Sequence, residues 1–194
     1  MKIMLNKPLL MGWVWILTAS SAPVLSSGNP VLQGAHVHGE AVLNVVQEGT
    51  TVYIEFESPA INLVGFEHAP INPEQKAALS NARQILAATD RLFQFGATRC
   101  LLESKEINVP YPGQPAHNHP HRHEHESAQE AHHEHADFQA SYTFQCEQAS
   151  DLRAISTTLF SLFPGIQTIK AQWISQGRQG STSLTPSDAT LRLN

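Results

Sequence analysis

Histidine sets this sequence apart, because it occurs 11 times among 194 residues that include only 2 cysteines. Eight of the histidines fall within nineteen residues and are interleaved with glutamates: His117, His119, His121, His123, His125, His132, His133 and His135. Alternate residues share a side of an extended chain, and residues three or four apart share a helix face, so either conformation gathers several imidazoles. Neutral imidazoles suit Zn²⁺, and also Cu²⁺ and Ni²⁺. The tract therefore predicts binding of a divalent metal, in preference to a merely solvated polar linker.

Three further histidines lie in segments that are expected to fold, namely His36, His38 and His68. His36 and His38 are two residues apart at the start of a predicted strand, so their side chains leave the same face. His68 lies in the connection before a predicted helix. Ordering a flexible tract costs about 1–2 kcal/mol per residue, so ligands held by the folded body should bind metal more tightly. Spacing alone leaves open that these are three unrelated surface or core histidines.

Other function classes have weaker support in the sequence. The formal charge is −5, and an acidic chain lacks the basic surface that nucleic acid requires. Neither a Gly-rich phosphate loop nor the His-Glu-x-x-His motif of zinc proteases occurs. Glu55 and Glu57 alternate on a predicted strand, as expected of a solvated face. We therefore expect no enzymatic activity, no catalytic residues and no organic cofactor.

Residues 1–22 have the pattern of a signal peptide. Lys2 and Lys7 precede an apolar run over residues 8–17, which is too short to span a bilayer, and small residues follow up to a predicted cleavage after Ala22. Its removal leaves a charge of −7 and predicts an exported, periplasmic protein with no stable membrane insertion. In an oxidising compartment, Cys100 and Cys146 favour a disulfide over a metal site. We expect it to join the two bases of the histidine tract.

The periodicity of apolar residues predicts the elements that would position these side chains. A hairpin is expected over 37–46 and 51–56, and a helix over 73–93 with Asn72 as its cap. The other expected elements are a helix over 151–162 capped by Ser150 and strands over 98–108, 138–147, 166–175 and 182–193. Residues 110–136 are rich in proline and lack large apolar side chains after Tyr111, which predicts a disordered loop. The fold class is α+β, a single domain over 23–194 with an antiparallel sheet and two helices packed on one face.

Two segments also resemble a known family. The sequence Gly-Ala-His-Val-His-Gly over residues 34–39, and Ser-Pro through Glu-His-Ala-Pro over residues 58–70, closely resemble the opening of the ZrgA family of periplasmic zinc-binding proteins. The resemblance continues through Cys100, the His-rich insertion, Trp173 and residues 184–186.

The resemblance has direct functional implications. It places zinc ligands at His36, His38, Glu67 and His68, and it favours Zn(II) over copper or nickel. It implies capture of zinc for a high-affinity zinc importer or its solute-binding component. The alternative is a periplasmic metal buffer or storage protein, or a copper or nickel tolerance protein, with no delivery role.

Overall fold

The computed structural model describes residues 37–112 and 136–193, all within one compact unit. The predicted signal peptide, His36 and all eight histidines of the tract lie outside the described residues. Within the described ranges, no helix is long and apolar enough to cross a membrane.

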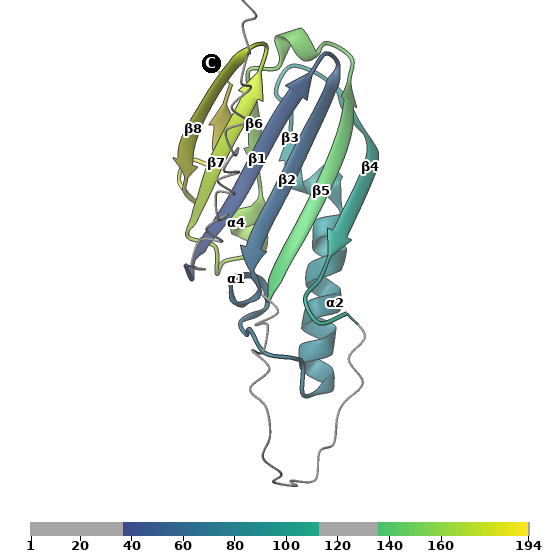
Figure 1. The fold of residues 1–194 in the computed structure, drawn as a ribbon, viewed down its shortest axis with the longest axis vertical. Helices are drawn as coiled ribbons and strands as arrows, with labels where there is room; N and C mark the ends of the chain where they lie inside the picture. The colour runs from purple at the N-terminus through teal and green to yellow at the C-terminus, as the bar shows by residue number, and fades with distance from the viewer. Residues whose placement is uncertain (1–36, 113–135, 194) are drawn as a thin grey trace, which may run out of the picture. The chain divides into compact units, whose positions relative to one another are not determined.

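A six-stranded sheet in the order β4-β5-β2-β1-β7-β8 forms the front layer in Figure 1. Its strands are β1 (Glu40–Glu48), β2 (Thr51–Pro59), β4 (Cys100–Asn108), β5 (Asp137–Cys146), β7 (Thr168–Ser175) and β8 (Arg178–Leu184). The predicted hairpin is confirmed as β1 and β2, whose turn contains Gly49 at φ +58°. The expectation of a wholly antiparallel sheet is wrong, because β1 and β7 are parallel. The chain crosses through the second layer between β5 and β7, as a parallel pairing requires.

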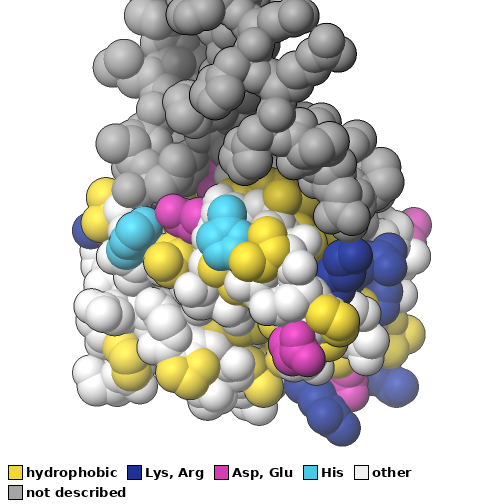
Figure 2. Space-filling model, turned by 90° about the horizontal axis from the view of Figure 1, so that it is seen from below, with side chains coloured by type: hydrophobic (Ala, Val, Ile, Leu, Met, Phe, Trp, Pro, Cys, Tyr) yellow, Lys and Arg dark blue, Asp and Glu magenta, His cyan; other side chains and the backbone are white. Residues whose placement is uncertain are grey.

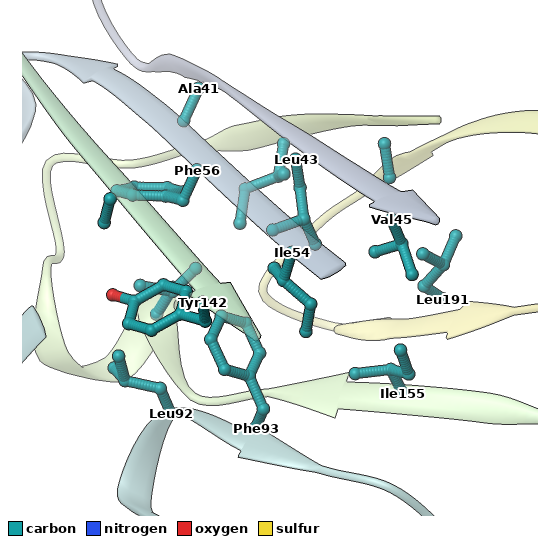
Figure 3. Close-up of a cluster of buried hydrophobic side chains, with 14 of the residues drawn as sticks. Ala41, Leu43, Val45, Ile54, Phe56, Leu92, Phe93, Tyr142, Ile155 and Leu191 are labelled. Carbon is teal, nitrogen blue, oxygen red and sulfur yellow. The ribbon is translucent and has the colours of Figure 1, made fainter. Parts of the chain in front are cut away.

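The second layer packs against one face of this sheet. It contains a small sheet in the order β3-β6-β9, built from β3 (Phe93–Gln94), β6 (Ala154–Thr157) and β9 (Thr190–Arg192). Its helices are α1 (Ala60–Val64), α2 (Pro73–Ala87), α3 (Thr89–Leu92) and α4 (Leu159–Leu162), with a 3₁₀ turn over Ala149–Asp151. Figure 3 shows Val45 and Ile54 of the large sheet facing Ile155 and Leu191 across the core. The α+β class is confirmed, as a mixed sheet with one long helix.

The helix predicted over 73–93 begins as expected and ends early. The Asn72 side chain accepts a hydrogen bond of 2.8 Å from the Gln75 amide, which confirms the cap. Helical geometry is lost at Ala88, and the short α3 leads into strand β3 at Phe93. Phe93 is buried and lies edge-on to Tyr142 at 5.4 Å between ring centroids. An extended backbone there pairs with β6, whereas a continuous helix could not.

The helix predicted over 151–162 is wrong for most of its length. Residues 154–157 form strand β6, and only Leu159–Leu162 are α-helical. The apolar spacing that suggests a helix also lets Ile155 and Thr157 alternate on one side of an extended segment, and both are buried. Pairing with β3 and β9 decides between the two, and those partners are distant in sequence. The strand predicted over 182–193 is likewise two strands, β8 and β9.

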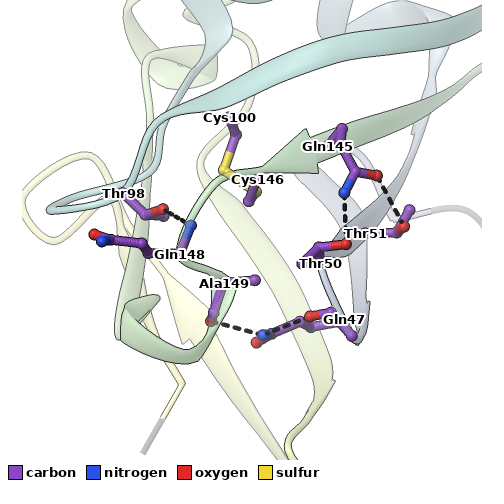
Figure 4. Close-up of a disulfide and its surroundings, with 10 residues drawn as sticks. Gln47, Thr50, Thr51, Thr98, Cys100, Gln145, Cys146, Gln148 and Ala149 are labelled. Carbon is purple, nitrogen blue, oxygen red and sulfur yellow. Dashed lines mark hydrogen bonds between the residues drawn. A yellow bond between two sulfur atoms is a disulfide. The ribbon is translucent and has the colours of Figure 1, made fainter.

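The predicted disulfide is confirmed, but its location is not the expected one. Cys100 and Cys146 are bonded and their Cα atoms are 4.0 Å apart (Figure 4). Cys100 begins β4 and Cys146 ends β5, so the bond closes the end of this strand pair that is opposite to residues 113–135. The bases of the tract are instead Asn108 and Asp137, at the other end of the same two strands.

Candidate metal site

The candidate site lies where β2 ends and the chain turns through α1. This five-residue helix ends at Gly65, whose φ of +84° favours glycine. The chain then returns past the start of β1 through Phe66, Glu67 and His68. Gly165 packs so closely on α1 that an added Cβ would lie 2.3 Å from the Asn62 carbonyl oxygen.

Buried Asn62 connects α1 to the residues that enter β1. Its Oδ1 accepts a 2.7 Å hydrogen bond from the Gly39 amide, and its Nδ2 donates to the Glu40 carbonyl at 2.9 Å. Nδ2 also lies 3.1 Å from the Ser58 hydroxyl oxygen. Gly39 has φ +83°, which explains why glycine follows His38. Asn62 therefore sets the position of the backbone that carries His38.

The two segments that resemble the family meet at His38 and Glu67. His38 Nε2 is 3.2 Å from Glu67 Oε2, although the residues are 29 positions apart. Both side chains contact solvent, with 63% and 35% of their surface exposed. An imidazole and a carboxylate in contact at the surface are two ligands that Zn²⁺ accepts, and water can reach both.

A hydrogen bond of His68 determines which of its ring nitrogens carries the proton. Its Nδ1 donates a 2.9 Å hydrogen bond to the Ala69 carbonyl, which as an acceptor requires the proton on Nδ1. In the neutral ring, Nε2 then carries the lone pair that a metal needs. The ring also lies against Phe66, with centroids 5.2 Å apart. A hydrogen bond of this kind is the usual way in which proteins orient a ligating histidine.

The structure brings together part of the predicted ligand set. His38 and Glu67 are in contact, and His68 follows Glu67 directly in the chain. Figure 2 shows both described histidines on one end of the molecule with acidic side chains beside them. No three His, Cys, Asp or Glu side chains of the described residues form a group that could hold a metal. His36 and the histidine tract, which lie outside those residues, are the other predicted ligands.

Both ends of the tract attach beside this site. The Tyr111 hydroxyl donates to the Glu67 carbonyl on the outgoing side. On the returning side, the Ala60 amide at the start of α1 donates a 2.7 Å hydrogen bond to the Ala136 carbonyl. Sequence reasoning missed both Asn62 and Tyr111. A polar residue within an otherwise apolar helix, and an aromatic residue between two prolines, were the available signals.

The other carboxylates singled out in the sequence behave as expected. Glu55 and Glu57 are exposed on the outer face of β2. On the same sheet, Glu40 and Lys170 approach to 3.5 Å. Solvent screens such partly exposed charges, which indicates a solvated face and not a site.

The family model for ZrgA family zinc uptake proteins matches residues 35–193 of this chain. The chain belongs to the ZrgA family. The match includes all four candidate ligands of the body and the whole histidine tract. No curated protein matches the chain. Membership in a zinc uptake family associates this protein with zinc and indicates a role in zinc uptake.

Proposed function

We propose that this ZrgA-family protein captures Zn²⁺ in the periplasm and supplies it to a high-affinity importer. The contact between His38 and Glu67, beside His68 and both ends of the tract, is the observation that carries the proposal. The pattern of residues 1–22 and the disulfide of the body support an oxidising location outside the cytoplasm.

Capture and retention are assigned to different parts of the chain. The sequence of the tract predicts a disordered loop, and we expect its eight histidines to be weak ligands, because ordering such a loop costs conformational entropy. The body supplies His38, Glu67 and His68 on backbone that Asn62 and α1 already hold, with His36 two residues before His38. The contact between His38 and Glu67 is already formed, so these two ligands lose less conformational entropy when zinc binds, and binding is tighter.

We propose binding without catalysis. A catalytic zinc site is a shaped, dry cavity with an open coordination position, whereas His38 and Glu67 are substantially exposed. Residues 121–125 match the His-x-x-Glu-His spacing of some zinc peptidases. A tract with histidine at alternate positions produces this spacing by itself.

Zinc titration by calorimetry tests the assignment. The intact mature chain should show several weak sites and at least one tighter site. Deletion of 116–135 should remove most weak sites and keep the tight one; it spares Ala136, whose carbonyl holds the α1 amide. In that background, His38→Ala with His68→Ala should abolish tight binding. A further test variant, Glu67→Gln, removes the carboxylate that contacts His38. Glu57→Gln is its matched control, because both residues are surface carboxylates. Loss of all zinc binding on deletion of the tract would refute the body site.

Delivery is distinguished from buffering by mixing the zinc-loaded protein with the importer's solute-binding component. Transfer that accelerates with acceptor concentration indicates direct exchange. Transfer at the rate of spontaneous zinc dissociation, whatever the acceptor concentration, would indicate a buffer or storage protein. N-terminal sequencing of protein from a periplasmic extract should begin at Pro23.

A further inference from the structure

A groove of about 390 Å³ lies between α2 and the segment that follows β4. Its floor is apolar and includes Leu79, Val109 and Pro110. Leu79 and Pro110 are buried, and exposed residues of α2 flank them. Ile71, just before α2, is 79% exposed and adds apolar surface at the same end of the helix.

Two cations stand at the groove. Lys76 and Arg83 are seven residues apart on α2, so they lie on one face of the helix, and both line the groove. Both are exposed, and neither belongs to any of the ion pairs found in residues 37–112 and 136–193. The chain as a whole is acidic, with a formal charge of −5. A pair of unpaired cations above an apolar floor fits an occupant that carries both carboxylates and apolar side chains.

The groove adjoins the candidate metal site. Tyr111 lines the groove, and its hydroxyl donates to the carbonyl of Glu67. Its φ of +61° is unusual for a non-glycine residue, and this hydrogen bond helps to hold it there. Pro70, two residues after His68, lines the other side. Figure 2 shows Lys and Arg side chains on the same end of the molecule as the histidines, with hydrophobic side chains between them.

We propose that this α2 groove docks an acidic, partly apolar segment of the importer's solute-binding component. The proposal rests on the proposed function, since it names the partner that receives the zinc. Covering the apolar floor excludes water, which strengthens the pairing of Lys76 and Arg83 with carboxylates. A partner seated there lies beside Glu67 and His68, so zinc can pass between ligand sets without release into bulk solvent.

Charge reversal tests the docking site. The probe is the purified solute-binding component from the same organism, titrated into the zinc-loaded full mature chain. Lys76→Glu with Arg83→Glu should weaken the complex about tenfold or more, with zinc stoichiometry unchanged. Lys76→Gln with Arg83→Gln should shift affinity in the same direction by less, and it guards against a fold defect in the reversed variant. The matched control is Arg91→Glu with Arg178→Glu, which changes the net charge equally at two exposed positions that lie outside the groove and belong to no ion pair of the described residues.

Each result decides the proposal. If the groove variants weaken the complex and the control does not, docking at α2 is supported. Equal weakening by the control shows a general charge effect and overturns it, as does equal binding by all variants or no complex with the wild type. A groove variant that instead converts a dimer into a monomer in sedimentation identifies a second copy as the occupant and also overturns it. The proposed function is judged separately, because calorimetric zinc binding without the partner decides the metal site.

Discussion

Asn62 shows how a residue outside the candidate ligand set can fix the geometry of the candidate metal site. It is 5% exposed, and its amide bonds to both Gly39 and Glu40, on either side of the turn into β1. Without Asn62, the Gly39 amide would be buried with no acceptor. The backbone that carries His38 would then lack this hydrogen bond to α1. His38 and Glu67 would then sample many relative positions, and each zinc bound would have to reorder them.

We expect Asn62→Ala to lower the free energy of unfolding by about 1–3 kcal/mol and zinc affinity at the body site by about tenfold. Asn62→Asp retains the acceptor for Gly39 and should recover part of the affinity. Urea denaturation without zinc and zinc titration of the chain lacking 116–135 measure the two effects. Reduced stability with unchanged affinity in the alanine variant would mean that Asn62 acts on the fold alone.

At the scale of elements, the site depends on how closely α1 packs against the residues that precede β7. Gly165 lies against the backbone of Asn62, where a methyl group has no room. Gly180 on β8 offers a comparison, because an added Cβ there would lie 2.8 Å from the ring of Trp173 on β7.

Gly165→Ala and Gly180→Ala should each cost about 1–3 kcal/mol of stability, since both force a packed neighbour to move. Only Gly165→Ala should weaken zinc binding, because it displaces α1. Thermal melting and zinc titration of both variants check this. Equal zinc affinity in the two variants would contradict the role assigned to α1.

The disulfide is an element-scale feature that should be independent of zinc. It joins β4 and β5 on the order of 25 Å along the strands from the tract, given about 3.3 Å per residue. For a loop of 46 residues the chain-entropy stabilisation is about 4 kcal/mol. Cys100→Ser with Cys146→Ser should therefore lower the melting temperature and leave zinc affinity unchanged. Two free thiols in the denatured wild-type protein, or lost zinc binding in a folded variant, would contradict this.

At the scale of the whole molecule, two pH effects act on different parts. Zinc binding requires neutral imidazole, and an unperturbed imidazole has a pKa of about 6.5, so protonation competes with zinc as pH falls. We expect zinc release to begin below about pH 6, measured with a chromophoric zinc indicator. Binding that persists unchanged to about pH 4 would show that carboxylates, and not histidines, hold the metal.

The stability of the core should fall at alkaline pH. Burial raises the pKa of Tyr142 far above its ordinary value, and its hydroxyl donates a 2.8 Å hydrogen bond to Leu86. Because the folded chain keeps this proton, its contribution to stability is complete below about pH 10 and declines as pH rises further. Urea unfolding between pH 8 and 11 should show a steeper alkaline loss for wild type than for Tyr142→Phe. Parallel curves would contradict this.

Local patterns were sufficient for the features that depend on neighbouring residues. The β1–β2 hairpin follows from alternation around Gly49, and the start of α2 follows from Asn72 and Pro73. The pairing of the two cysteines could be predicted from their number and from the oxidising compartment that the signal-peptide pattern predicts. His36, His38, Glu67 and His68 could be named as candidates because they stand in two short motifs.

Tertiary structure decided which segments pair and which side chains meet across the fold. Residues 154–157 suit a helix or a strand by pattern, and partners in β3 and β9 make them a strand. The parallel pairing of β1 with β7, the site of the disulfide and the Asn62 hydrogen bonds have the same origin. A hydrogen bond or contact between distant segments depends on the path of the chain between them, which no local periodicity contains. For this reason His38 and Glu67 become partners only in the folded body.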